Sequence, residues 1–225
     1  MTVAQNEVAV PGEVLATGMD YLPSYGTYRN GENIHAKIVG LAKVDGKVIK
    51  LIPLNGQYYP KKDDTVIGRV FDILISGWRL DLRSGHSAVL PLQEASNDFI
   101  KRNARLDQYF DIDEWVVCQI TNVTSQKLID VSTKGPGLRK LNGGRIITVV
   151  PYKVPRIIGK GGSMVSLIKE KTGSKVIVGQ NGIIWIANET PEMELKTVEA
   201  IKFVEANAHT EGLTDRVKEL LGDEE

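Results

Sequence analysis

The stretch that decides the fold of the C-terminal third is Ile158-Gly159-Lys160-Gly161-Gly162-Ser163-Met164-Val165-Ser166-Leu167-Ile168. Gly159 and Gly162 frame a two-residue turn, and the apolar residues after it have the spacing of a helix that ends at Gly173. Glycines at these positions let the chain approach a phosphodiester backbone closely, and the next helix offers free N–H groups and the positive end of its dipole. Lys160 adds a cation at the point of contact. The stretch therefore predicts a turn that binds a phosphate backbone.

Two other phosphate-binding loops do not fit these residues. A Walker loop needs a lysine and then serine or threonine after its last glycine, and here Gly162 precedes Ser163 and Met164. A dinucleotide fingerprint needs a third glycine where the chain has Met164. A purely structural glycine turn between two helices stays open as an alternative.

The residues around this stretch complete the pattern of one small domain, for which we set the bounds 145–208. Before the glycine turn, we expect a strand and then a short helix with Pro155 in its first turn. After the turn and its second helix, we expect two strands and then a long helix that starts at Thr190-Pro191. Asn181-Gly182 predicts a tight turn between the two strands. This order, with the I-G-x-x-G-x-x-V-x-x-I signature at 158–168, resembles the type I KH domain, whose turn clamps RNA. Contact of Gly159, Lys160, Gly161 and Gly162 with RNA is what the resemblance implies.

The middle of the chain, residues 61–134, has the pattern of a five-stranded OB barrel. Short strands are expected at 65–74, 76–82, 86–90, 115–123 and 128–132, and a helical excursion falls in 93–113, before the fourth strand. The segment resembles the OB domain of the ribosomal S-one type. That family presents an aromatic residue on the second strand and a histidine at the end of the third, where this chain has Arg79 and Leu90.

The departure weakens or moves the platform on which RNA bases stack. Trp78 and His86 are the nearby candidates for a replacement, although Trp78 fits a barrel core equally well.

Residues 1–60 predict a small β module without a cluster of catalytic residues. Asp45-Gly46 indicates a hairpin turn. Tyrosine is frequent in this part, and its apolar ring with a polar tip suits both a small β core and a protein interface. We therefore interpret the module as a docking domain. The expected fold class is multidomain, all-β plus α/β: this module, the OB barrel and the KH domain, followed by an acidic tail or short helix at 209–225.

Charge is distributed unevenly along the 225 residues. The 28 basic and 28 acidic side chains give a net charge of zero. Residues 145–187 nevertheless hold seven basic residues and one acidic residue, whereas residues 188–225 hold four basic and eleven acidic residues. A basic block of this density indicates a polyanionic partner, unless it is an ordinary solvated face. We expect an electrostatic funnel for RNA from these basic residues: Lys153, Arg156, Lys160, Arg69, Arg79 and Arg83.

Several classes of protein are excluded or disfavoured. No apolar run approaches the roughly 18 residues of a membrane span, and the N-terminus lacks a signal-peptide pattern, which predicts a cytoplasmic protein without membrane contact. Cys118 has apolar neighbours, as a buried thiol does. The three histidines, His35, His86 and His209, show no metal-ligand spacing. We predict no catalytic residue, no metal and no cofactor.

Nearly the full chain resembles the archaeal exosome RNA-binding cap subunits that contain a KH domain. The matching stretches are Val10-Pro11-Gly12-Glu13, Gly26-Thr27-Tyr28, Tyr58-Tyr59-Pro60, Val66-Ile67-Gly68-Arg69-Val70 and the loop from Gly159 to Met164. The resemblance implies a non-catalytic subunit, present in three copies on a hexameric ring of ribonuclease-PH-like subunits. In that family the N-terminal module docks on the ring, and single-stranded RNA, preferably adenine-rich, is captured and passed to the ring for degradation. A primase-like partner is also implied.

Two other functions stand beside this one. Antitermination-type transcription factors also place an OB domain before KH, but with two KH domains in a row, and only one complete set is present here. A stand-alone phosphodiesterase is the enzymatic alternative, for which the sequence shows no catalytic set.

Overall fold

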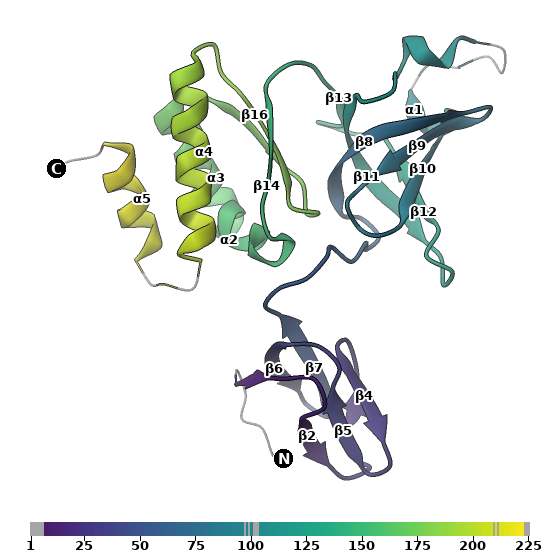
Figure 1. The fold of residues 1–225 in the computed structure, drawn as a ribbon, viewed down its shortest axis with the longest axis vertical. Helices are drawn as coiled ribbons and strands as arrows, with labels where there is room; N and C mark the ends of the chain where they lie inside the picture. The colour runs from purple at the N-terminus through teal and green to yellow at the C-terminus, as the bar shows by residue number, and fades with distance from the viewer. Residues whose placement is uncertain are drawn as a thin grey trace. The chain divides into compact units, whose positions relative to one another are not determined.

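The computed structural model describes residues 7–96, 98, 100, 104–208, 210 and 212–222. The chain divides into two compact units, Met1–Gly56 and Gln57–Glu225. The first unit holds the N-terminal module, and the second holds a β-barrel and a KH domain (Figure 1). The predicted fold class is confirmed.

The N-terminal unit consists of two small, mostly antiparallel sheets that pack around one core. One sheet has the order β1-β6-β7-β3 and the other β2-β5-β4. Small and branched side chains such as Leu15, Ile34 and Ile49 are fully buried between them. The predicted hairpin is present between β6 and β7, but its turn residues are Gly46 and Lys47, because Asp45 already pairs with Val48. The strands are β1 Val8–Ala9, β2 Val14–Thr17, β3 Leu22–Pro23, β4 Thr27–Asn30, β5 Asn33–Ala36, β6 Gly40–Asp45 and β7 Val48–Pro53.

The second unit begins with a closed five-stranded barrel, as the spacing of the strands predicted. Strand order is β12-β10-β9-β8-β11, and pairing of β12 with β11 closes the barrel. A short helix and a 3-10 turn lie between the third and fourth strands, and β13 adds to the edge of β11. The elements are β8 Thr65–Leu74, β9 Gly77–Asp81, β10 Ser87–Pro91, α1 Leu92–Ala95, η1 Leu106–Gln108, β11 Trp115–Val123, β12 Ile129–Ser132 and β13 Arg139–Leu141.

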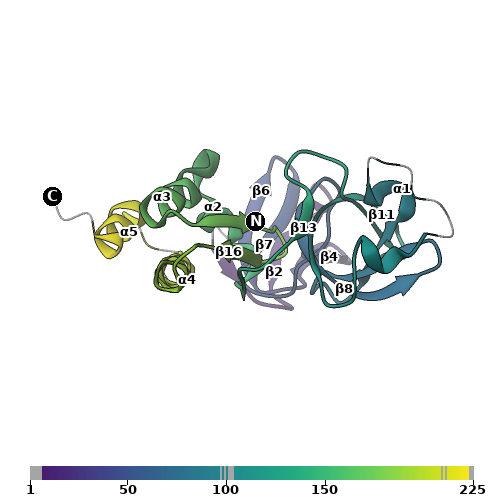
Figure 2. The same cartoon turned by 90° about the horizontal axis from the view of Figure 1, so that it is seen from above.

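The KH domain has a three-stranded sheet of order β14-β16-β15. Figures 1 and 2 show its helices gathered on one side of this sheet. The helices pack on the sheet through a core that includes Ile157, Ile168 and Ile201, and α5 adds Leu213 and Val217 to it. The elements are β14 Arg145–Thr148, η2 Pro151–Lys153, α2 Val154–Ile158, η3 Lys160–Gly162, α3 Ser163–Thr172, β15 Lys175–Val178, β16 Ile183–Ala187, α4 Pro191–Ala206 and α5 Leu213–Leu221.

Strand β16 is apolar on both faces because it separates two cores. Ile184 and Ile186 belong to the core under the helices. Ile183 and Trp185 point the other way, since side chains alternate along a strand, and they pack in a cluster with Ile67 of the barrel. The barrel and the KH domain therefore share an apolar junction, which agrees with their assignment to one compact unit.

A second contact at this junction is the turn between β15 and β16. The Asn181 side chain is 3% exposed, and its amide accepts from the Ile67 N–H at 3.2 Å and donates to the Ile67 and Leu82 carbonyls at 2.7 and 3.0 Å. Pairing of β8 with β9 stops at Arg69 and Asp81, so the amide satisfies backbone groups just beyond the end of that ladder.

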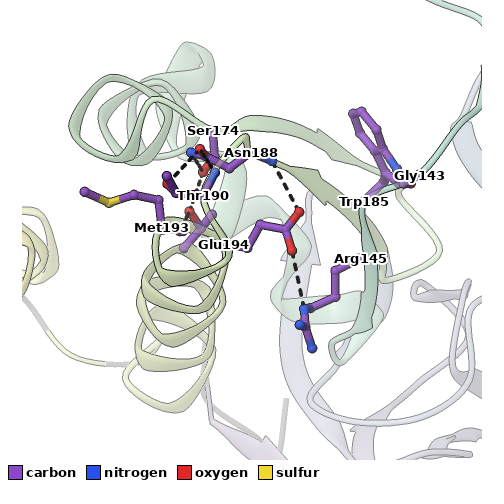
Figure 3. Close-up of polar contacts among 9 residues, drawn as sticks. Gly143, Arg145, Ser174, Trp185, Asn188, Thr190, Met193 and Glu194 are labelled. Carbon is purple, nitrogen blue, oxygen red and sulfur yellow. Dashed lines mark hydrogen bonds and ion pairs between the residues drawn. The ribbon is translucent and has the colours of Figure 1, made fainter.

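A polar network fixes the far end of α3 and hence the helix that carries the predicted glycine turn (Figure 3). Asn188 donates through its Nδ2 to the Thr172 carbonyl and the Ser174 hydroxyl, both at 2.9 Å. Its backbone N–H donates to the carboxylate of Glu194, which also faces Arg145 at 3.8 Å. The network joins the ends of α3 and β16 to the start of α4.

Candidate nucleic-acid interface

The Gly159–Gly162 turn connects α2 to α3 in a conformation that requires glycine. Gly159, Gly161 and Gly162 have φ values of 76°, 63° and 85°, in the left-handed region that β-carbons disfavour. A β-carbon on Gly159 would lie 2.7 Å from the Met164 nitrogen, so this glycine is needed for packing as well. Gly161 and Gly162 have nothing within 4 Å of that position. The two residues that follow Lys160 are therefore open to a ligand.

The electrostatics of the turn favour an anion. Among the described residues no side chain caps the N-terminus of α3, so the positive end of its dipole faces the turn, although the Ser163 N–H itself donates to the Lys160 carbonyl. Lys160 and Arg156 are exposed, and neither side chain has a hydrogen-bond or ion-pair partner among the described residues. Lys160 lies in the turn itself, and Arg156 lies in α2, four residues earlier in the chain.

Lys153 has a different role. Its ammonium donates to the Glu205 carbonyl at 2.9 Å, at the end of α4, and the Val150 N–H donates to the Glu205 carboxylate at 2.7 Å. Since the lysine is partly buried and bonded to the fold, we leave it out of the proposed RNA interface.

An apolar groove of about 480 Å³ runs beside the turn, and the sequence reasoning missed it. One wall comes from α2, α3 and β15, through side chains such as Ile158, Val165 and Val176. The other wall comes from the barrel and the segment 136–139 that leads out of it. Lys169 and Arg139, both exposed, supply positive charge on the two walls. The two walls come from segments between 19 (Arg139 to Ile158) and 113 (Thr65 to Val178) residues apart, so no local pattern predicts the groove.

The barrel gives a mixed outcome for the predicted residues. Trp78 is fully buried; its ring packs edge-on against Phe110, and its Nε1–H donates to the Phe110 carbonyl at 2.8 Å. This corrects the expectation that Trp78 can stack on RNA: it is a core residue with no free ring face. His86 is exposed on the connection between β9 and β10.

The three predicted arginines of the barrel are all exposed. Arg69 lies 3.4 Å from Asp113, and Arg79 lies 3.9 Å from Asp72. Such exposed pairs contribute roughly 0–1 kcal/mol and leave the arginines available to a phosphate. Arg83 follows β9, and its backbone N–H donates to Asp81 at 2.8 Å.

The predicted residues therefore form two groups, one at the KH turn and one on the barrel. Arg69 and His86 line a hollow of about 400 Å³ on the barrel together with Phe71, a residue that the sequence reasoning did not single out. The signal for Phe71 was present in the alternation along β8, in which Arg69 and Phe71 are the outward positions.

The geometry does not support metal binding or a reactive thiol within the described part of the chain. No group of three metal-ligating side chains occurs there, and His209 lies outside it. Burial raises the pKa of the Cys118 thiol to about 12, as expected for an inert core cysteine. Among the described helices, none has the length and apolarity that a membrane crossing requires.

Comparisons with known proteins agree with the domain order. Residues 6–55 match the family model described as exosome RNA-binding protein RRP4 N-terminal domain, and residues 144–192 match the KH domain. A crystal structure assigned to the exosome complex RNA-binding proteins superimposes with a TM-score of 0.67 at 28% identity, over 74% of this chain and 95% of the other.

Curated relatives match along nearly the whole chain. Exosome complex component Rrp4 of Pyrococcus furiosus is 40% identical over 222 residues, which cover 97% of this chain and 84% of the relative. The protein of the same name from Methanothermus fervidus is 39% identical over 219 residues, covering 97% and 96%. The chain therefore belongs to the family of the archaeal exosome complex component Rrp4.

Proposed function

We propose that this protein is a non-catalytic, RNA-binding subunit of an archaeal exosome in the cytoplasm. It captures single-stranded RNA, with adenine-rich tails favoured, and passes the RNA to a ring of phosphorolytic ribonuclease subunits. The observation that carries the proposal is the Gly159–Gly162 turn, which is open at Gly161 and Gly162 and lies at the start of α3, with Lys160 and Arg156 exposed. The exosome relatives support the assembly part of the proposal.

The groove beside the turn supports binding of a single strand. Its apolar walls suit unstacked bases, and Lys169 and Arg139 suit the phosphates between them. A duplex keeps its bases paired and stacked and offers no free base to such a groove. We therefore include the groove residues in the proposed interface, with the KH turn as the phosphate contact.

The N-terminal unit is proposed to dock on the hexameric ring of ribonuclease-PH-like subunits, in a cap of three copies. Within its described residues, the unit exposes many large apolar side chains, although its core is small, and such exposure indicates a protein interface. These side chains are Val8, Val10, Met19, Leu22, Tyr25, Tyr28, Val39, Ile52 and Leu54. A primase-like protein is a further proposed partner of the assembly.

The test is a titration of labelled oligoadenylate with the full chain at two salt concentrations. The variant Lys160→Asp with Gly161→Asp reverses charge at the turn, keeps both framing glycines, and places aspartate where αL backbone is tolerated. We expect loss of most of the affinity and a smaller dependence on salt, because fewer counterions are released.

A matched control makes the same chemical change elsewhere. Lys218→Asp with Gly222→Asp alters an exposed lysine on α5 and the open glycine of positive φ that follows this helix. We expect this control to bind RNA with nearly native affinity. Equal binding by the turn variant and the native chain would refute the KH turn as the RNA contact. Shortening of the RNA by the pure chain in the presence of phosphate would refute the non-catalytic assignment.

The antitermination alternative needs a second KH domain. The described residues form one KH sheet and its helices, so the observation that would favour the alternative is missing there.

A further inference from the structure

Phe71 is an exposed aromatic residue at an irregular point of β8. The register of β8 with β9 shifts between Val70 and Asp72, so Phe71 is the extra residue of a β-bulge. Its side chain is 39% exposed. Bulges re-aim side chains and are frequent next to functional sites. The aromatic ring is therefore exposed at a point where the strand departs from regular geometry.

The ring borders the hollow of about 400 Å³ that also contains Arg69 and His86. Arg69 lies two residues before Phe71, and both are exposed in the alternating burial of β8. His86 reaches the hollow from the neighbouring connection, beside Gly85 and Ser87. Two segments, β8 and the connection that holds His86, thus bring together an aromatic ring, a guanidinium and an imidazole. Proteins that bind single-stranded RNA use aromatic rings for stacking on bases and cationic side chains for contact with phosphates.

We propose that Phe71 is a stacking platform for one base of single-stranded RNA, and that Arg69 holds the adjoining phosphate. The inference rests on the proposed function and adds a second contact point on the barrel. Trp78, the aromatic residue that the sequence offered as a platform, is committed to the core, so Phe71 takes that place on the barrel surface.

The charges around the hollow set the orientation of the bound strand. Asp81 also lines it, and its carboxylate repels a phosphate, so the base and not the backbone must lie on that side. One Asp81 oxygen accepts from the Arg83 N–H, which leaves the other to accept a hydrogen bond from an amino group on a base. Among the described residues, the Arg69 guanidinium pairs only with the exposed carboxylate of Asp113, so a phosphate can take that place.

The experiment uses the full chain and oligoadenylate that carries 2-aminopurine, whose fluorescence falls when it stacks. The variants are Phe71→Ala, Phe71→Trp and Arg69→Ala. We expect Phe71→Ala to lose about tenfold in affinity and most of the quenching, because one base–aromatic stack is removed. Phe71→Trp should retain both, and its retention shows that an aromatic face, not packing of phenylalanine, is required.

Salt dependence separates stacking from charge. Phe71→Ala should keep the native salt slope, whereas Arg69→Ala should reduce the slope by about one, since one phosphate contact is lost. Tyr109→Ala is the matched control, because Tyr109 is an aromatic of the same barrel with 38% exposure and does not line the hollow.

The outcomes distinguish the two proposals. Native affinity and quenching in Phe71→Ala, or an equal loss in Tyr109→Ala, would overturn the platform and leave the proposed function intact. A native chain that binds no oligoadenylate would overturn the proposed function and the platform together. A smaller salt slope in Phe71→Ala would mean that the variant disturbs Arg69, and the assignment of stacking to Phe71 would fail.

Discussion

The KH domain contains two turns with the same glycine spacing and opposite surroundings. Gly159-Lys160-Gly161-Gly162 is exposed beyond its first glycine, with open space around Gly161. Gly179-Gln180-Asn181-Gly182 lies at the junction with the barrel, where Asn181 is bonded to the backbone of Ile67 and Leu82. Two glycines three residues apart therefore allow close approach of a chain, and the surroundings decide whether the neighbour is a ligand or another domain.

The largest expected effect comes from removing the Asn181 amide. In Asn181→Leu, which has similar size, the Ile67 N–H and the Ile67 and Leu82 carbonyls lose their partner in a buried place. Each unsatisfied group costs roughly 1–3 kcal/mol, so we expect the free energy of unfolding of residues 57–225 to fall by about 3–5 kcal/mol. Urea denaturation followed by tryptophan fluorescence measures the loss.

Gln180→Ala is the control in the same turn. The bond from Gln180 to the barrel runs from its backbone N–H to the Thr65 carbonyl at 2.9 Å, which alanine keeps. We expect a change within about 0.5 kcal/mol. A loss in Gln180→Ala as large as in Asn181→Leu would contradict the assignment of the junction to the Asn181 amide.

The glycines of the two turns give the next contrast. Gly182 has φ of 79°, and a β-carbon there would lie 2.4 Å from the Val149 carbonyl oxygen, so Gly182→Ala meets strain and a backbone clash. Gly161 has φ of 63° but open space. We expect Gly182→Ala to cost about 3 kcal/mol or more and Gly161→Ala about 1 kcal/mol.

Thermal unfolding of the two variants side by side checks this order. If Gly161→Ala is the more damaging, the exposed turn has a structural neighbour that its open surroundings do not show, and the contrast between the turns fails.

The same contrast between the two turns shows which features of the fold the sequence could predict. The signature at 158–168 predicted the KH domain because its chemistry is local: glycines for the turn, apolar residues for the next helix, and a lysine between them. Strand spacing predicted the barrel for a similar reason. Asn181-Gly182 looked like an ordinary hairpin turn, because the partners of Asn181, at Ile67 and Leu82, are about 100 residues away.

The residues of the candidate site also differ in whether their contacts are local in the sequence. Lys160 and the glycines of its turn could be predicted, since one short segment forms the whole turn. The groove walls, the burial of Trp78 and the bond from Lys153 to Glu205 depend on which distant segments meet. Phe71 was readable from alternation along β8, but the bulge that presents it is visible only in the pairing with β9.

The variant Lys160→Ala in the exposed turn should change stability least, and it tests the comparison between the two turns most directly. The Lys160 side chain is exposed and has no partner among the described residues, so its removal should change the free energy of unfolding by less than about 0.5 kcal/mol. RNA binding should nevertheless weaken, with a salt slope smaller by about one, because one phosphate contact is lost. Oligoadenylate titration at several salt concentrations, together with urea denaturation of the same preparation, measures both quantities. A clear loss of stability with an unchanged salt slope would make the exposed turn a structural element like the buried one, and the two turns would then differ in position but not in role.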